Sequence, residues 1–420
     1  MNIAPFLEEI LPGVGKPTRY TNREWNAVHK DHASVEVKVV LAFPDIYEVG
    51  MSHLGLKILY YILNQRQDTV AERTFMPWKD MEAKMREKGL PLFALESRRP
   101  IIEFDIVGFT LQYELSYTNI LNMLDLAGIP LEAADRDEGH PFIVGGGPGA
   151  FNPEPLAGFF DFFAIGDGEE VIGEIVELYK EAKAAGAKRG DFLRRIAKLP
   201  GIYVPSLYDV AYKEDGRVDN IRPLEEGLPG KVEKRAVRDL DEAPFPDRFV
   251  VPFMEVIHDR IMLEAFRGCT RGCRFCQAGM IYRPVRERCP EELGRLAEEI
   301  IRRTGYGEIS LVSLNTADYS CIRDLLRRLA QHYRERGVEI SLPSLRVDSF
   351  SVGLANEIKQ ARKGGLTFAP EAGTQRLRDV INKGVTEEDL MEAVTLAFES
   401  GWSSVKLYFM IGLPTESEED

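Results

Sequence analysis

The chain has few cysteines and no long apolar run. Its 420 residues include five cysteines, all of them beyond residue 268. So few cysteines, all in one half of the chain, argue against a secreted disulfide scaffold and favour a reducing compartment. No apolar stretch reaches the roughly 18 residues that a membrane helix requires. The N-terminus has no basic segment followed by an apolar core, which argues against a signal peptide. We therefore expect a cytoplasmic protein without a membrane partner.

The sequence also lacks an excess of basic residues. It carries 53 Lys and Arg against 67 Asp and Glu, for a net charge of -14. The chain as a whole therefore has no basic footprint for nucleic acid, and local pairs such as Arg302-Arg303 are typical of solvated helix faces. With 44% hydrophobic and 29% charged residues, the composition is that of an ordinary globular protein. The length predicts two or three domains of about 150 residues each.

Three of the cysteines lie close together. Cys269, Cys273 and Cys276 occur in the run Cys-Thr-Arg-Gly-Cys-Arg-Phe-Cys. Three thiolates on one short loop can hold three irons of a [4Fe–4S] cluster and leave the fourth iron open for chemistry. A zinc site is the alternative, but zinc usually takes four ligands, commonly in pairs. The remaining cysteines, Cys289 and Cys321, are not paired, and a four-cysteine site that uses Cys289 stays open as an alternative.

The first half of the chain alternates strands and helices. Strands are predicted at Val35–Phe43, Asp105–Leu111, Pro141–Val144 and Phe162–Ile165, and helices at Gly55–Leu63, near Tyr117–Leu126 and through Lys180. This alternation predicts a parallel sheet covered on both faces, and so a Rossmann-like α/β domain over residues 35–223. Residues 1–34 form a leading segment. Residues 202–223 form a small β appendage around the turn Glu214-Asp215-Gly216.

A second series of βα units follows a charged, proline-rich linker at residues 224–260. Strands are predicted at Ile261–Phe266, Glu308–Leu314, Glu339–Leu345, Leu366–Ala369 and Val405–Ile411, and helices near Glu291–Arg303, Ile322–Arg336, Val352–Ala361 and Glu387–Ser400. Repeated βα units with loop glycines predict a (β/α) barrel over residues 261–420. The three cysteines directly follow its first strand, on the barrel face where βα loops carry active sites.

Two runs of the sequence carry a resemblance to a known family. The spacing CxxxCxxC, with Phe275 before the last cysteine, resembles the signature of the radical S-adenosylmethionine (SAM) enzymes. The wider runs Ala42–Gly55 and Arg271–Met280 resemble B12-binding-type radical SAM proteins, which place a cobalamin-binding-like domain before the radical core. More narrowly, they resemble a bacterial family of that group that often has a further C-terminal domain.

The resemblance implies cofactors and a reaction type. A [4Fe–4S] cluster on the three cysteines would hold SAM at its open iron and cleave it to methionine and a 5'-deoxyadenosyl radical. The electron would come from an external flavodoxin- or ferredoxin-like donor. Cores of this kind usually have six βα units, whereas this chain reaches Asp420 after its fifth strand. We therefore expect a partial (β/α)6 radical SAM barrel that is truncated at its C-terminal end.

The resemblance also indicates residues that hold SAM, by their place in the loops. They are Phe275, Asn315, Glu371, Gly373, Arg376 and Gly412. Only the location is carried over for Asn315, because the common Gly-Gly-Glu is missing there. Glu371 would bond the ribose or the methionine end, Arg376 would pair with the SAM carboxylate, and Gly412 would flank the adenine. Glu371 has an alternative as an acid that favours a helix N-terminus. Lys383 is expected to be a surface charge.

The N-terminal domain resembles cobalamin-binding domains less completely. Many of these use Asp-x-His-x-x-Gly to supply a cobalt ligand, and Asp45–Gly50 has this frame with Tyr47 in place of the histidine. A phenol is a poor substitute for imidazole, and the nearby His53 is expected to be a capping or surface residue. The resemblance places cobalamin contacts at Thr110, Gly145, Gly146 and Gly147, where glycines let a ligand approach the backbone. A degenerate domain that binds no corrinoid is the alternative.

These features together favour an enzyme that generates a 5'-deoxyadenosyl radical. With cobalamin it would transfer a methyl group to carbon; without it, it would modify RNA or protein. Methylthiolation normally needs a second cluster, and these residues contain no second cysteine triplet. The alternative from another class is a non-catalytic iron–sulfur or corrinoid-binding sensor or scaffold. The sequence does not indicate a substrate.

Overall fold

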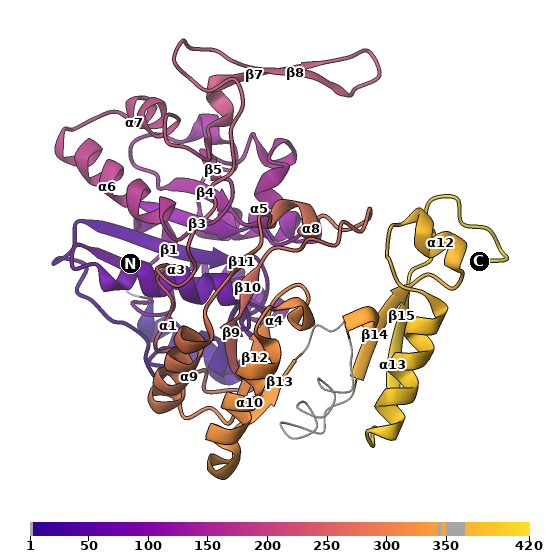
Figure 1. Ribbon diagram of the computed structural model, residues 1–420. Helices are drawn as coiled ribbons and strands as arrows, with labels where there is room; N and C mark the ends of the chain where they lie inside the picture. Colours follow the sequence, from indigo (N-terminus) through magenta and orange to yellow (C-terminus); the bar gives the residue numbers. More distant parts are fainter. Residues whose placement is uncertain (1–2, 343–345, 350–365) are drawn as a thin grey trace. The chain divides into compact units, whose positions relative to one another are not determined.

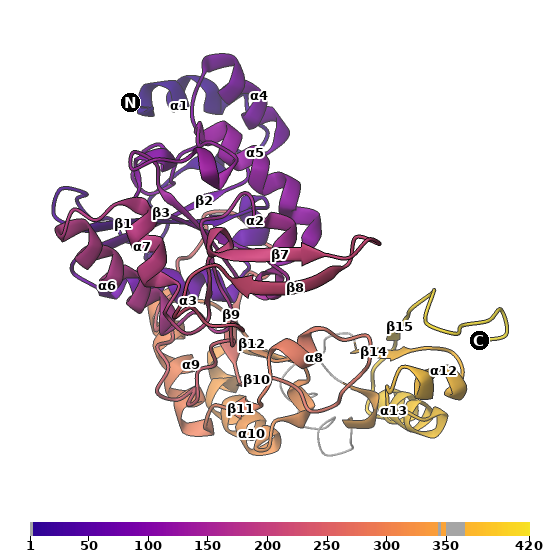
Figure 2. The same cartoon turned by 90° about the horizontal axis from the view of Figure 1, so that it is seen from above.

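The chain divides into two compact units. A computed structural model describes residues 3–342, 346–349 and 366–420 (Figures 1 and 2). The first unit comprises Met1–Val237 and Pro244–Asp259, and the second comprises Arg238–Ala243 and Arg260–Asp420. The expected linker is therefore shared between the units. The helix predicted at Val352–Ala361 lies outside the described residues.

A six-stranded sheet forms the centre of the first unit, in the order β2-β1-β3-β4-β5-β6. Strands β1 to β5 are parallel, and β6 pairs antiparallel with β5. Their bounds are β1 Val37–Phe43, β2 Thr69–Phe75, β3 Ile106–Thr110, β4 Phe142–Gly146, β5 Phe162–Ala164 and β6 Ile202–Tyr203. The near-continuous apolar run of β1 suits a parallel strand that is covered on both faces. The predicted α/β fold with a parallel sheet is confirmed.

Strand β2 was not predicted from the sequence. Its middle residues, Glu72 and Arg73, are charged, and burying charges is costly unless they are paired. All seven residues of the strand are buried. The guanidinium of Arg73 lies 2.7 Å from Glu96 and 3.1 Å from Glu24, measured from nitrogen to oxygen. These carboxylates come from distant parts of the chain, so the sequence pattern of the strand itself does not reveal them.

Helices connect the strands of the first unit. They are α1 Ala4–Ile10, α2 Tyr47–Gly50, α3 Leu54–Gln65, α4 Lys79–Lys88, α5 Tyr117–Ala127, α6 Val171–Ala184 and α7 Arg189–Ile196. Helix α3 packs against β1, β2 and α6. It begins after His53, whose Nδ1 accepts a hydrogen bond from the Leu56 amide at 3.1 Å, so that His53 takes the capping role, one of the two roles expected for it. Strands β7 Tyr208–Tyr212 and β8 Val218–Pro223 form the predicted β appendage.

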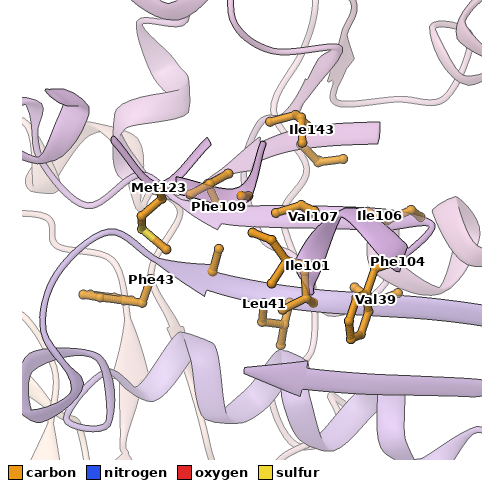
Figure 3. Packing of buried hydrophobic residues seen from close by; sticks show 14 of the residues in the cluster. Val39, Leu41, Phe43, Ile101, Phe104, Ile106, Val107, Phe109, Met123 and Ile143 are labelled. Carbon is orange, nitrogen blue, oxygen red and sulfur yellow. The ribbon is translucent and has the colours of Figure 1, made fainter. Parts of the chain in front are cut away.

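The core of the first unit covers both faces of the central strands (Figure 3), where consecutive residues such as Ile106 and Val107 are buried. Alternate positions of a strand point to the same face, and Val39, Leu41 and Phe43 of β1 follow this spacing. Each of them is at most 3% exposed. They belong to one apolar cluster with Ile101, Phe104, Phe109 and Met123. This rigid core holds the carboxyl ends of the parallel strands at one edge.

The second unit repeats shorter βα segments. Its strands are β9 Ile261–Glu264, β10 Phe266–Arg267, β11 Arg286–Glu287, β12 Glu308–Val312, β13 Glu339–Ser341, β14 Leu366–Glu371 and β15 Val405–Phe409. Its helices are α8 Ala278–Ile281, α9 Pro290–Thr304, α10 Ile322–Tyr333, α12 Gln375–Val380 and α13 Glu387–Glu399. Strands β13-β12-β9 form one parallel sheet and β14-β15 form another. Within the described residues these strands do not close a barrel.

Candidate active site

The cysteine loop directly follows the first strands of the second unit, as predicted. Cys269 comes two residues after the end of β10, and Gly268 lies between them with φ of +98°. A Cβ at Gly268 would lie 2.7 Å from the backbone oxygen of Pro284. The turn therefore requires glycine, both for its left-handed backbone and for this close approach.

The three cysteines are free thiols, and each sulfur receives an N–H group. The donors are Arg271 N to Cys269 Sγ at 3.4 Å, Gly279 N to Cys276 Sγ at 3.3 Å, and Arg346 Nη1 to Cys273 Sγ at 3.6 Å. Hydrogen bonds to sulfur are among the factors that set the reduction potential of iron–sulfur clusters. The loop therefore provides the donor chemistry that a cluster needs.

The thiols are not gathered into a preformed metal site. Over the described ranges, no three His, Cys, Asp or Glu side chains are placed so as to hold a metal ion. Three free thiols on one loop, each with an N–H donor, still match an iron–sulfur cluster by their chemistry. Cys289, the fourth ligand in the zinc alternative, has another role: it is the N-cap residue of α9, and its sulfur accepts the Glu292 amide at 3.4 Å.

Arg346 joins three segments of the second unit. Besides Cys273, its guanidinium donates to the backbone oxygen of Lys383 at 2.6 Å, and its amide donates to Asn315 Oδ1 at 3.3 Å. Asn315 is 2% exposed, and its Nδ2 is buried without a hydrogen-bond partner in the described part of the chain. A buried amide with a free donor is costly unless it meets a ligand or water. This orphaned donor fits a polar cofactor such as SAM.

Lys383 is not a surface charge, contrary to the sequence prediction. It is 7% exposed, and its Nζ lies 3.2 Å from Glu371 Oε1 and 5.8 Å from the ring centre of Phe275. The carboxylate and the ring offset the burial of the ammonium. Glu371 has φ of +70°, a conformation that is uncommon for residues other than glycine. Two predicted SAM residues, Phe275 and Glu371, therefore meet on one lysine.

Three other predicted SAM residues have partners elsewhere in the second unit. Arg376 forms an ion pair with Asp420 and donates to the Thr415 oxygen at 3.0 Å. Hydrogen bonds from Arg376 and Thr374 hold the pKa of Asp420 well below its usual range. A Cβ at Gly373 would lie 2.6 Å from the Asp420 backbone oxygen. Gly373 and Thr374 lie between β14 and α12, Arg376 lies on α12, and Figure 1 draws α12 next to the C-terminal end of the chain.

Gly412 completes this second group. Its amide and that of Leu413 both donate to Glu416 Oε2, each at 2.6 Å. The structure thus separates the predicted SAM residues into an Arg346–Lys383 group with Asn315, Glu371 and Phe275, and a group in the last segment of the chain, where Gly373 and Arg376 contact Asp420 and Gly412 contacts Glu416. Arg346 and Lys383 were missed as site residues. The sequence could have indicated Arg346 as a site residue, because it immediately follows the third predicted strand of the second series, where βα loops carry active-site residues.

Tyr47 does not occupy a ligand position in the first unit. It is 2% exposed, its hydroxyl donates to Glu24 Oε1 at 3.1 Å, and its ring contacts Phe75 at 5.3 Å between centres. Burial raises the pKa of Tyr47 far above its ordinary value. His53 is engaged as a cap, and burial lowers its pKa to about 4. It is therefore neutral at pH 7.

Two of the predicted cobalamin-contacting glycines are required by the fold itself, one by packing and one by its backbone conformation. A Cβ at Gly145 would lie 2.6 Å from the Phe163 ring, and Gly147 has φ of +101°. Thr110 and Gly146 are register partners at the ends of β3 and β4, and both are half-buried. A Cβ at Gly146 would meet nothing closer than 3.9 Å. Thr110 and Gly146 are therefore the partly accessible pair at this edge of the sheet.

Comparisons with known proteins agree with both halves of this description. Residues 55–205 match the family described as radical SAM proteins, N-terminal, and residues 263–420 match the radical SAM superfamily. "Uncharacterized protein MJ0966" of Methanocaldococcus jannaschii is 31% identical over 386 residues, which are 91% of this chain and 71% of that protein. "Uncharacterized methyltransferase PH0819" of Pyrococcus horikoshii is 26% identical over 66% of this chain and 56% of its own length.

Among solved structures, the cobalamin-dependent SAM radical enzyme OxsB has a similar fold. The TM-score is 0.60 at 16% identity, over 89% of this chain and 49% of OxsB. This chain thus spans about half of OxsB and of the Pyrococcus relative. No helix among the described residues is long and apolar enough to cross a membrane.

The fold and the cysteine loop therefore define a radical SAM protein. The chain belongs to the radical SAM superfamily, with an N-terminal domain and a radical core. It is accordingly an enzyme, and the cofactors of its family are a [4Fe–4S] cluster and SAM. These findings confirm the radical SAM family and the enzyme class predicted from the sequence, and the predicted cluster and SAM are the cofactors of that family.

Proposed function

We propose that Cys269, Cys273 and Cys276 hold a [4Fe–4S] cluster that cleaves SAM reductively. The observation that carries this proposal is the set of three free thiols, each with an N–H donor, on the loop after β10. When bound, the cluster supplies the electron that converts SAM to methionine and a 5'-deoxyadenosyl radical. A flavodoxin- or ferredoxin-like protein is the proposed source of that electron.

The chain's own residues orient SAM and shape its site. The orphaned Nδ2 of Asn315 would donate to SAM, and the carboxylate of Glu371 would accept from the ribose or the methionine end of SAM. Lys383 holds Glu371 in place, and Arg346 holds the cysteine loop against the end of β12. Arg376 reaches the SAM carboxylate only by exchanging its present partner, Asp420. Gly373 and Gly412 would offer backbone groups to SAM, with Gly412 at the adenine.

The first unit is proposed to bind cobalamin over the carboxyl ends of its parallel strands. The fold likeness to OxsB, a cobalamin-dependent enzyme by name, supports this proposal, and Thr110 and Gly146 offer partly accessible contacts. Since Tyr47 is buried on Glu24, no protein group from that position would coordinate the metal. Bound cobalamin would supply methyl-transfer chemistry. The protein is incubated with hydroxocobalamin and desalted to test this proposal. An unchanged visible spectrum and no retained corrinoid would show that the first unit does not bind cobalamin.

Methyl transfer to carbon is the reaction that we infer. The Pyrococcus relative is named a methyltransferase. Methylthiolation is less favoured, because beyond the triplet these residues contain only Cys289 and Cys321, and Cys289 caps a helix. Relatives named as methylthiotransferases of tRNA and of ribosomal protein uS12 support RNA or protein as the substrate class.

Anaerobic reconstitution tests the central proposal. The protein is loaded with iron and sulfide, reduced with dithionite and supplied with SAM, and 5'-deoxyadenosine is measured. We expect formation of 5'-deoxyadenosine that the Cys269→Ala variant abolishes. If both proteins formed only background amounts of 5'-deoxyadenosine, the proposed enzymatic activity would be rejected and a cofactor-binding sensor would be favoured.

A further inference from the structure

A cavity of about 100 Å³ lies inside the first unit. Helix α3 provides one side, with Leu56, Lys57 and Tyr60 among its lining residues, and irregular segments near residues 26–28 and 248–250 provide another. These two segments are joined to each other by Asn26, whose Nδ2 donates to the Phe249 oxygen at 3.0 Å. The family resemblance assigns no role to this cavity.

Lys57 is the unusual residue of the cavity. It is 7% exposed, and its Nζ lies 4.9 Å from the ring centre of Phe249, which also lines the cavity. Within the described part of the chain, this ammonium donates no hydrogen bond and forms no ion pair. Burial lowers the pKa of Lys57 to about 8, against the opposing attraction of Asp259. The side chain is therefore still largely protonated at pH 7.

The charge around the cavity is unbalanced. Lys57, Arg73 and Arg248 line it, and no carboxylate does so among the lining residues. Arg73 forms ion pairs with Glu24 and Glu96, which neutralise its charge, whereas Lys57 has no ion-pair partner among the described residues. An apolar side chain of similar length would avoid the cost of this buried charge. Such costs are typical of positions that bind a ligand.

The remaining lining limits what the ligand can be. Met51, Leu56, Phe249 and Val250 provide apolar walls. The volume of about 100 Å³ is below the roughly 150 Å³ of an apolar cavity that binds benzene. An anion with a short apolar tail satisfies the charge, the walls and the size together. We propose that this cavity binds a short-chain monocarboxylate, with its carboxylate on Lys57 Nζ and its alkyl part against Leu56 and Phe249. This proposal is independent of the cysteine loop and of SAM.

Thermal unfolding of the whole protein at pH 7 tests the proposal. Propionate is titrated at constant ionic strength, with chloride and inorganic phosphate as comparison anions. A ligand that binds only the folded state raises the melting temperature in a saturable way. We expect such a rise with propionate, at least a tenfold loss of apparent affinity in Lys57→Met, and no loss in Lys79→Met, a control at an exposed lysine.

Three results would overturn the proposal. They are the absence of a saturable shift with propionate, an equal shift in Lys57→Met, and a larger shift with phosphate than with propionate. The last would mean that the cavity recognises inorganic anions rather than carboxylates. Lys57→Met is expected to fold, because it replaces a buried charge by an apolar side chain of similar length.

Discussion

Lys383 and Glu371 form a largely buried ion pair, with 3.2 Å between Nζ and Oε1. The pair joins the loop after α12 to the end of β14, and the lysine also faces Phe275 of the cysteine loop. Glu371 is one of the two predicted SAM residues that this lysine contacts. The pair therefore connects the stability of the second unit to the position of a group that we expect to contact SAM.

Breaking this pair from one side should destabilise the second unit. Lys383→Met leaves the Glu371 carboxylate without its partner, and removing one member of a buried pair costs about 3–5 kcal/mol. Because Glu371 keeps some exposure (16% of its side chain), we expect the lower end of that range. The double variant with Glu371→Gln should recover much of the loss in chemical denaturation. Equal stability of the single variant and the wild type would contradict the role of the pair.

Arg346 should raise the reduction potential of the cluster, because its charged N–H group points to Cys273 Sγ. Removing a donor to a cluster sulfur makes reduction less favourable. We expect Arg346→Gln to lower the potential by on the order of 50 mV, which is about a tenfold change for one electron. A redox titration followed by electron paramagnetic resonance measures it.

Arg274→Gln is the matched control for that experiment. Arg274 lies on the same loop, but its guanidinium donates to the Val380 backbone oxygen rather than to a sulfur. Its potential should stay close to that of the wild type. Equal potentials in both variants would show that the Arg346 contact does not tune the cluster.

Cluster loading should depend on the triplet and not on Cys289. Cys276→Ala removes a proposed ligand and should lose most of the iron and sulfide after reconstitution. Cys289→Ala removes only the N-cap of α9, which costs about 0.5–2 kcal/mol in stability for the usual capping residues, and should keep the full metal content. If Cys289→Ala lost the metal and the wild type bound zinc in its place, the four-cysteine alternative would be correct.

His53 should make the first unit sensitive to mild acid. Its pKa is lowered from 6.5 to about 4 by burial, so the unfolded chain binds the proton more readily between these values. The stability that neutral His53 contributes is complete above pH 6.5 and is lost as the pH falls toward 4. Since His53 is half-buried, the loss should be on the order of 1 kcal/mol. His53→Asn retains a capping side chain and should show a smaller drop in urea midpoint between pH 7 and pH 5; an unchanged drop would contradict this.

Lys57 should destabilise the empty protein at neutral pH. Its pKa falls from 10.5 to about 8 on folding, so the unfolded chain again binds the proton more tightly. Stability attributable to this group therefore rises as the pH increases from 8 to 10.5. We expect Lys57→Met to be more stable than the wild type at pH 7, by on the order of 1–3 kcal/mol. The difference should shrink toward pH 10 in paired urea unfolding curves; a difference independent of pH would exclude this cause.

Local patterns in the sequence were sufficient for much of the fold. The apolar run of β1, the alternation of strands and helices, the β7–β8 appendage and the cap at His53 all depend on residues close together in the chain. The cysteine triplet likewise carries its chemistry in its spacing, and the position of Asn315 after a strand placed it near that loop. Periodicity and spacing are properties of neighbours, and so they can be read directly.

Tertiary structure alone decided where charged residues are buried. Strand β2 was missed because Arg73 reads as exposed until Glu24 and Glu96 are seen beside it. Lys383 was misjudged for the same reason, because its partner Glu371 and the Phe275 ring come from other segments. A buried charge is tolerated only when distant groups compensate it, and Lys57 stands out because it has the Phe249 ring but no hydrogen bond or ion pair among the described residues. The sequence by itself determined the reaction class through the cysteine spacing, whereas the pairing of these charges required the folded chain.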